Sequence, residues 1–525
     1  MLKKNKKYIQ DEKINTGLKL LVKSSIVIFV GIFLSKLFTY LYRILIARYF
    51  GPEVYGIFSL ALIVLGFFIA FSLLGLTEGI LRFTSLYRGK KQFNKIKYLF
   101  NISLIFLFFS SFFFAVLLFI LSEFIAINIF HNEDIIVFLK IFSILIPISV
   151  FSNLFLSILR AFERVGWYSF IWNILQNLTK LLVLIILIIF GFKINAIIFS
   201  YFLSILVVLI ASYLFCKYNL SEIFGKSTLR KKEKRKIKME VFSYSWPIMF
   251  SGLIVNLFYW TDSFFLGYFK GAIDVGLYNA AIPLVGLMSF APVIFTQLFF
   301  PLITKEFSMK NYWVINQLSK QVGKWIFILN LPLFLIIILF PGAIINLFFG
   351  ENYLAAEGAL RILVIGGFIS SWVFISNDLI SMVGKSKVIL TNLLLASIVN
   401  IVLNILLIPK YGMIGAAVST TIVWVILSFT LLIELKYYVS IIPLRRKMLR
   451  VFFISMIPLA FLLIAKQFVV INMFSLILLG IFFVFIYFLL ILLTGCLDRE
   501  DIMILEALKK KIIDRKTYYF TDTSA

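Results

Sequence analysis

Runs of Leu, Ile, Phe and Val long enough to cross a bilayer follow one another almost without a break from Leu20 to Thr494. A transmembrane helix needs about 20 consecutive, mostly apolar residues. Backbone groups inside the hydrocarbon must be hydrogen-bonded within the protein, and these runs lack the period-two alternation of barrel strands. The sequence therefore predicts an all-α, polytopic membrane protein.

Polar residues divide this apolar sequence into about 14 expected spans. The composition agrees, because 62% of the 525 residues are hydrophobic and only 14% are charged, whereas soluble domains carry about 25% charged residues. The expected spans lie at roughly 21–48, 54–79, 98–121, 135–159, 168–190, 194–216, 241–267, 276–300, 325–345, 358–382, 388–408, 412–435, 451–465 and 472–494.

Basic residues are concentrated in every second loop. The net charge is +27, and about 41 of the 51 Lys and Arg fall on one side of the expected arrangement. Because cytoplasmic loops are rich in Lys and Arg, this side and both termini are assigned to the cytoplasm, and the chain to the cell (inner) membrane. The basic segment 230–238 then serves topology first and contact with membrane lipids second, and no nucleic-acid partner is expected. The basic stretches are 1–23, 82–97, 160–167, 217–240, 301–324, 383–387, 436–450 and 495–525.

Residues suited to metal or covalent chemistry are few. Cys216 and Cys496 are the only cysteines, and His131 is the only histidine. Two distant cysteines and a lone histidine make neither a disulfide framework nor a zinc site. We therefore expect no metal, no cofactor and no enzymatic activity. The first apolar segment is too long for a signal peptide and is expected to be a retained span.

The chain repeats itself at an offset of about 220 residues. Gly51 and Gly56, after the first span, match Gly271 and Gly276, after the seventh. An offset of six spans returns the chain to the same side of the membrane, which predicts two parallel six-helix lobes with a substrate path between them. The expected divisions are an N-lobe at 1–216, a basic cytoplasmic linker at 217–240, a C-lobe at 241–436, two further spans within 437–494 and a cytoplasmic amphipathic tail at 495–525.

Several segments at helix ends carry a family resemblance. Residues 47–60, Ala-Arg-Tyr-Phe-Gly-Pro-Glu-Val-Tyr-Gly-Ile-Phe-Ser-Leu, resemble the oligosaccharide flippases of the multidrug/oligosaccharidyl-lipid/polysaccharide exporter superfamily. The segments 160–168, 382–387 and 408–417 are also similar to that family. The resemblance implies alternating access by two lobes, which carry a polyprenyl-diphosphate-linked oligosaccharide from the cytoplasmic to the outer leaflet for cell-surface polysaccharide biosynthesis.

Charges inside the spans are the best candidates for a binding site, because each costs about 2.5–3.5 kcal/mol at the bilayer centre. Lys36, Tyr40 and Arg43 are spaced i, i+4 and i+7, which places them on one face of the first span. Lys180 lies in the middle of span five, with Gln176 and Asn177 one turn before it. These cations suit a diphosphate. The alternative is that they pair with carboxylates of other helices.

Two aspartates within the spans are open to either role. Asp262 lies in span seven, with Asn256 and Tyr259 at the preceding turns as candidate substrate contacts, and Asp378 lies in span ten. Each carboxylate could pair with a span-one cation or take up a coupling ion, H⁺ or Na⁺. We favour pairing for Asp262. Glu78 and Arg82, spaced i, i+4 at the cytoplasmic end of span two, are expected to form an intrahelical pair or a gate element and not a ligand site.

Other functions remain open at this point. A flippase for a lipid-linked peptidoglycan precursor would recognise the same diphosphate. A drug or cation antiporter of the same superfamily is less compatible with a path that holds more cations than carboxylates. A membrane glycosyltransferase or polymerase is least expected, because no cluster of acidic residues has metal spacing and no nucleophile lies beside a base.

Overall fold

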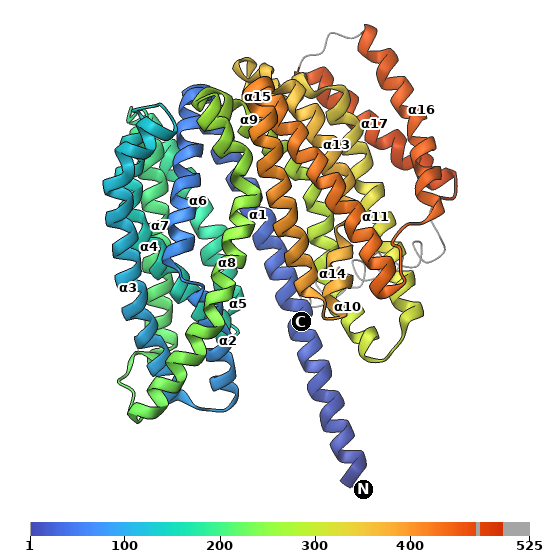
Figure 1. Ribbon diagram of the computed structural model, residues 1–525. Helices are drawn as coiled ribbons and strands as arrows, with labels where there is room; N and C mark the ends of the chain where they lie inside the picture. The colour runs from blue at the N-terminus through green and yellow to red at the C-terminus, as the bar shows by residue number, and fades with distance from the viewer. Residues whose placement is uncertain (1, 469–472, 497–525) are drawn as a thin grey trace, which may run out of the picture.

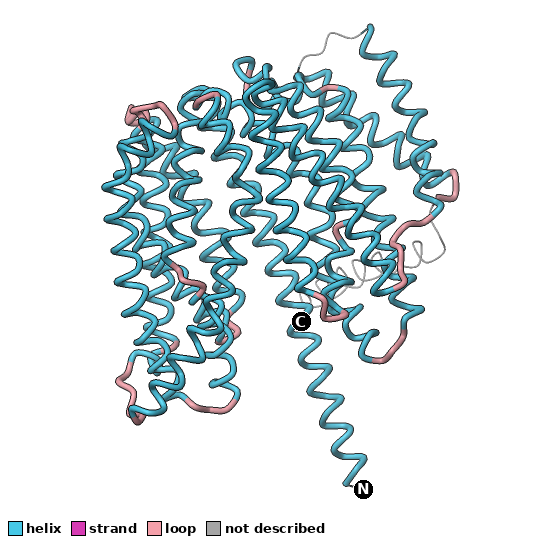
Figure 2. The backbone as a smooth tube through the Cα atoms, in the orientation of Figure 1, coloured by secondary structure: helices cyan, strands magenta, loops and turns pink. Residues whose placement is uncertain are grey.

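The structure of the protein is a computed structural model that describes residues 2–468 and 473–496. This part of the chain is helical and contains no strand (Figures 1 and 2). The helices of the first half are α1 (Leu2–Ser72), α2 (Leu76–Gly89), α3 (Phe93–Phe124), α4 (Ile135–Ala161), α5 (Val165–Ser169), α6 (Gln176–Ile189) and α7 (Asn195–Asn219). Those of the second half are α8 (Lys231–Phe269), α9 (Ala272–Gly286), α10 (Phe290–Ser308), α11 (Tyr312–Leu339), α12 (Pro341–Phe349), α13 (Glu357–Val373), α14 (Ile375–Met382), α15 (Ser386–Val439), α16 (Arg446–Phe468) and α17 (Met473–Leu493).

Within the described residues, 12 segments are long and apolar enough to cross a membrane. Two of them, Gly31–Ser72 and Ser386–Val439, have 42 and 54 residues. At a rise of 1.5 Å per residue they would be about 63 and 81 Å long, twice the bilayer core or more. Each is broken by a glycine outside helical geometry, Gly51 (φ 83°, ψ 176°) and Gly412 (φ 54°, ψ −132°). Each therefore supplies two crossings, and the predicted all-helical protein of about 14 spans is confirmed.

Several spans are interrupted where the hydrophobic pattern gives no sign of it. The second span leaves helical geometry at residues 73–75 before α2 continues to Gly89. Gly75 has φ 67°, and a Cβ there would lie 2.2 Å from the carbonyl oxygen of Ser245 in α8. Close approach of two backbones thus requires glycine at this turn. Span five consists of α5, the π-helical turn Phe170–Leu175 and α6.

The helices form two groups that are joined through α1, α8, α9 and α15. Figure 1 places α2 to α7 on one side and α10 to α17 on the other. Helix α1 packs along α9, and α8 packs along α15. The contact is tightest at Gly56 and Gly276, because a Cβ at either would lie within 2 Å of a backbone oxygen, 1.7 Å from that of Ala272 and 1.9 Å from that of Pro52. These two glycines, matched by the sequence repeat, therefore set the distance between the halves.

The basic segment between the halves is partly helical. Helix α7 ends at Asn219, and α8 already begins at Lys231. Residues 231–238 are therefore the first turns of a helix that continues to Phe269, and the linker is shorter than its expected 217–240. The expected amphipathic tail, apart from its first two residues, lies outside the described residues.

Candidate functional site

The cation stripe on α1 faces the second half of the protein. The ring of Tyr40 meets that of Phe290 in α10 edge to face, with centroids 6.3 Å apart. A Cβ on Gly286 of α9 would lie 2.9 Å from the Tyr40 hydroxyl. Lys36 is exposed, and Arg43 is half-buried. Tyr40 thus lies at the contact between the two halves, and Lys36 and Arg43 share its face of α1.

Within residues 2–468 and 473–496, neither cation of the stripe forms an ion pair with an acidic residue. Among the described residues, the ion pairs are Arg88–Glu163, Lys140–Glu123, Arg160–Glu78 and Arg361–Glu357. Arg43 is close enough to Lys36 and to the Tyr55 hydroxyl to interact with both electrostatically. Two neighbouring cations that lack a carboxylate form a site of positive potential, which suits an anion.

Lys180 lies inside the first half of the protein and not at its surface. Its ammonium donates to Oδ1 of Asn177 (2.9 Å) and lies 4.9 Å from the ring centroid of Tyr42 in α1. Its side chain is only 8% exposed. Asn177 accepts a hydrogen bond from Thr39 (3.0 Å) and donates to Ser35 (3.0 Å), both in α1. Gln176 is half-buried at the start of α6. Lys180 is therefore buried, but it is close enough to Arg43 of the stripe for the two cations to repel each other.

Asp262 is the centre of a polar cluster in the second half. It is 8% exposed and accepts hydrogen bonds from Tyr278 of α9 (2.6 Å), Asn404 (2.8 Å) and Asn400 (3.2 Å) of α15, and Thr420. All four donors are neutral. The favoured pairing of Asp262 with Lys36 or Arg43 is thus not found among the described residues, because hydroxyl and amide groups surround the carboxylate.

The Asp262 cluster contains an acceptor without a donor. Oδ1 of Asn404 is buried and has no hydrogen-bond partner among the described residues, although Nδ2 of Asn404 contacts Asp262. A buried polar atom without a partner costs about 1–3 kcal/mol. A cation at this place would remove that cost, since carboxylate, amide and hydroxyl oxygens are the ligands that hard cations prefer.

The other predicted residues lie apart from these two places. Tyr259 is 70% exposed on α8, and Asn256, one turn before it, donates to the Gly252 carbonyl. Asp378 lies beside Thr296 of α10, and one of its oxygens is buried without a partner among the described residues. The roles of Tyr259, Asn256 and Asp378 therefore stay predictions.

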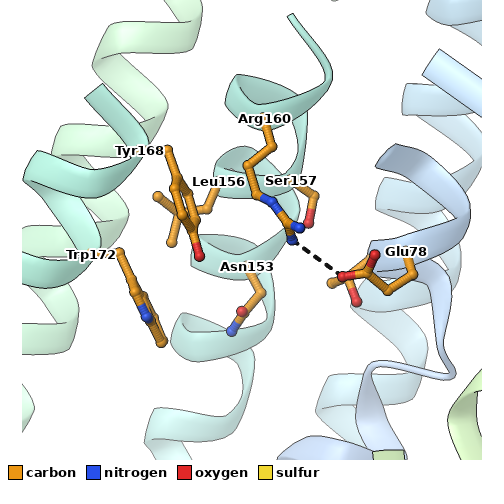
Figure 3. Close-up of a pocket in the computed structure, with 8 residues that line it drawn as sticks. Glu78, Asn153, Leu156, Ser157, Arg160, Tyr168 and Trp172 are labelled. Atoms are coloured by element: carbon orange, nitrogen blue, oxygen red, sulfur yellow. Dashed lines mark hydrogen bonds and ion pairs between the residues drawn. The ribbon is translucent and has the colours of Figure 1, made fainter. Parts of the chain in front are cut away.

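The pairing expected for Glu78 is wrong. Glu78 binds Arg160 of α4 at 3.2 Å, while the guanidinium of Arg82 lies 4.1 Å from the ring centroid of Tyr244 in α8. The end of α4 brings a second arginine to Glu78, and an aromatic face is available to Arg82. Figure 3 shows the ion pair of Glu78 and Arg160. The pair lines a cavity of about 130 Å³, which Tyr168 and Trp172 also line.

Sequence reasoning missed most of the Asp262 cluster. Tyr278, Asn400, Asn404 and Thr420 come from three different spans, and only the fold brings them together. One signal was present, because Asn400 and Asn404 are amides spaced i, i+4 within an apolar span.

Comparison with known proteins agrees with this architecture. The family model described as polysaccharide biosynthesis protein matches residues 21–305, more than half of the chain. The chain belongs to this family. A second family model, MatE, matches residues 247–406 of this chain. The predicted membership in the exporter superfamily is thereby confirmed.

Two curated relatives of this polysaccharide biosynthesis protein have descriptive names. A putative O-antigen transporter of Shigella flexneri is 26% identical over 392 residues, which cover 72% of this chain and 88% of the relative. A probable low-salt glycan biosynthesis flippase of Haloferax volcanii is 24% identical over 271 residues, covering 52% of this chain and 55% of the relative. Both are named as transport proteins and not as enzymes.

Solved structures share the fold of this family member. The lipid II flippase MurJ in an inward closed conformation superimposes with a TM-score of 0.70 at 18% identity, covering 88% of this chain and 98% of MurJ. An inward-facing multidrug resistance MATE transporter of the MOP superfamily gives a TM-score of 0.65 at 16% identity, with coverage of 79% and 98%. The predicted two-half transporter fold is confirmed.

Proposed function

We propose that this member of the family is a flippase, which carries a lipid-linked oligosaccharide from the cytoplasmic to the outer leaflet. The protein binds this substrate by its polyprenyl diphosphate. The observation that carries the proposal is the α1 stripe. Lys36 and Arg43 lie on one helix face at the contact between the halves, and no described carboxylate neutralises them. The named functions of the Shigella and Haloferax relatives support the same class of substrate.

The physical argument concerns the diphosphate and not the sugars. Two neighbouring cations attract a diphosphate through charge-assisted hydrogen bonds, which strengthen when the bound substrate displaces water. The same site repels cationic drugs, which disfavours an antiporter of cationic compounds. A lipid-linked peptidoglycan precursor carries the same diphosphate, so this second cargo differs only in the sugar that the path must accept.

Asp262 is the candidate site for a coupling ion, H⁺ or Na⁺. Its carboxylate is buried among neutral groups, and the unpartnered Oδ1 of Asn404 lies on a residue that contacts it. A sodium ion there would take oxygens of Asp262, Asn400, Asn404 and Thr420 once the two amides turn, and its bonds to these oxygens would replace the hydrogen bonds that the amides now donate to Asp262. A proton would instead sit on the carboxyl group.

Flipping of a fluorescent lipid-linked oligosaccharide in proteoliposomes tests the stripe. Lys36→Gln and Arg43→Gln keep a polar side chain of similar length and remove one positive charge each. Each should slow flipping at least about tenfold, because loss of one charge-assisted contact with a phosphate costs about 1.5–3 kcal/mol.

Lys193→Gln is the matched control, since Lys193 is an exposed loop residue and its substitution should leave the rate unchanged. Flipping at the wild-type rate by both stripe variants would refute the binding site. Equal flipping of a peptidoglycan precursor would widen the cargo and leave the stripe in place.

A further inference from the structure

The sequence repeat extends to the buried polar clusters of the two halves. Four residues of the first half, here the N-cluster, are Tyr42, Phe58, Lys180 and Ser200. At the repeat offset of about 220 positions lie Asp262, Tyr278, Asn400 and Thr420, here the C-cluster. The two clusters occupy equivalent spans, because Tyr42 and Asp262 belong to the first span of each half.

Equivalent residues make equivalent contacts in the two clusters. Tyr42 shares a hydrogen bond with Ser200 (3.1 Å), as Asp262 does with Thr420. The ring of Tyr42 meets that of Phe58 (6.1 Å between centroids), as Asp262 meets the hydroxyl of Tyr278 (2.6 Å).

The third contact is the one that carries the charge. The ammonium of Lys180 lies over the Tyr42 ring (4.9 Å), where Asn400 donates to Asp262 (3.2 Å). Each of the three contacts of Tyr42 therefore has a counterpart at Asp262, made by the residue at the equivalent position of the sequence repeat.

The clusters differ in the sign of their charge. The C-cluster has a carboxylate on the first span of its half. The neighbouring Asn404 has an oxygen without a hydrogen-bond partner among the described residues. The N-cluster has a neutral tyrosine at the carboxylate position and an ammonium at the position of Asn400. Leu184, fully buried, stands where the second half has Asn404. The four residues of the N-cluster therefore include no carboxylate for a free cation but already supply a positive charge.

The N-cluster is built to hold that ammonium. Nζ of Lys180 lies 4.9 Å from the ring centroid of Tyr42 and 5.8 Å from that of Tyr201, and it donates a hydrogen bond to Asn177. A cation over an aromatic ring is attracted by the negative face of the ring, and the attraction is stronger when the cation is desolvated. These contacts join α6 to α1 and α7, so the ammonium links three spans of the first half.

We propose that the Lys180 ammonium is a tethered counterpart of the cation taken up by the C-cluster, so that ion binding acts on the second half alone. The inference rests on the proposed ion site at Asp262. The first half stays assembled whatever the ion gradient, because its cation is covalently attached. Only the α8, α9 and α15 contacts around Asp262 then change strength when an ion binds or leaves.

Thermal unfolding of the full-length protein in nanodiscs, titrated with NaCl against choline chloride and with pH, tests this division. The wild type should be stabilised by Na⁺ or by acid, and Asp262→Asn should lose that response. Lys180→Met, which keeps a long unbranched side chain and removes the charge, should lower the Tm but keep the ion response. Lys180→Arg should restore part of the lost Tm.

A transplanted site provides the second arm. Tyr42→Asp with Lys180→Asn copies the C-cluster pair into the first half and, in an Asp262→Asn background, should restore stabilisation by Na⁺. If that variant does not fold, Lys180→Ala titrated with propylammonium replaces it, and added amine should raise its Tm more than choline does.

The outcomes separate the two proposals. If the Tm of the wild type responds to neither Na⁺ nor pH, the ion site at Asp262 is refuted and, with it, the shared role of the clusters. Lys180→Met with the wild-type Tm would refute the tethered cation, whatever Asp262 does. Loss of the ion response in Lys180→Met would show that ion binding acts on both halves, which also contradicts the proposal.

Discussion

Two buried charges of opposite sign mark the two halves at the residue scale. Lys180 is held by aromatic rings and an amide, and Asp262 by hydroxyls and amides. Neither has a partner of opposite charge among the described residues. An isolated charge in hydrocarbon is expensive, which makes function the better explanation for keeping both.

Substitution of Asp262 should uncouple flipping from its ion. Asp262→Asn preserves the shape of the side chain but removes the negative charge that a bound cation requires. We expect flipping driven by a Na⁺ or H⁺ gradient to fall to the rate without a gradient, while substrate binding persists. Asp378→Asn is the comparison, and an equal loss there, with Asp262→Asn unaffected, would move the ion site to span ten.

The sequence predicted some of these residues and not their neighbours. The spacing of Lys36, Tyr40 and Arg43 fixes a shared helix face, and the structure keeps that face. Spacing does not say how deeply a residue is buried, and Lys180, which was grouped with the stripe, lies inside the first half but within electrostatic range of Arg43. Asp262 was recognised by its charge, but its ligands come from spans that only folding brings together.

At the scale of elements, glycines set where helices break and how closely they pack. Gly51 and Gly271 share nearly the same geometry, with φ of 83° and 89°. Each allows the chain to turn between two spans, and L-residues with a side chain rarely adopt that conformation. The apolar pattern located the spans, but the breaks inside the second and fifth spans depend on tertiary contacts and were not predicted.

The Gly56 and Gly276 contact should be intolerant of a single methyl group. Gly56→Ala places a Cβ 1.7 Å from the Ala272 backbone oxygen, which forces α1 and α9 apart. Overpacking usually costs about 1–3 kcal/mol, and a clash with backbone lies at the upper end. We expect a lower Tm and little flipping.

Gly66→Ala is the control for this prediction. Gly66 lies in the same helix, and a Cβ there would meet nothing within 4 Å. Equal stability of Gly56→Ala and Gly66→Ala would show that the halves are not held at that distance.

At the scale of the whole molecule, the alternating basic loops predict the orientation in the membrane. Both native cysteines are buried, so single introduced cysteines can be labelled against a low background. We expect Lys90→Cys, Thr228→Cys and Lys447→Cys to react only with a membrane-permeant reagent in whole cells. Asn352→Cys and His131→Cys should react with an impermeant one. External labelling at Thr228 would invert the predicted topology.

The orientation also fixes the direction in which the membrane potential acts. An inside-negative potential favours outward movement of an anion by about 2.3 kcal/mol per charge for each 100 mV. We expect α1 to rock in place during alternating access, so that Lys36 and Arg43 are not carried across the membrane with the substrate and most of the moving charge belongs to the diphosphate. No Gly-x-x-x-x-Gly-Lys-Ser/Thr phosphate loop occurs in the chain, and ATP is not expected to be needed.

Flipping of a lipid-linked oligosaccharide under an imposed potential tests the central claim most directly. Proteoliposomes of defined orientation would be given a potassium gradient with valinomycin, and transfer would be followed by quenching of the labelled sugar. We predict faster transfer toward the outer face when the cytoplasmic side is made negative, and little transfer by Lys36→Gln with Arg43→Gln. Wild-type transfer at a rate that ignores the potential would contradict the movement of a diphosphate anion through this protein.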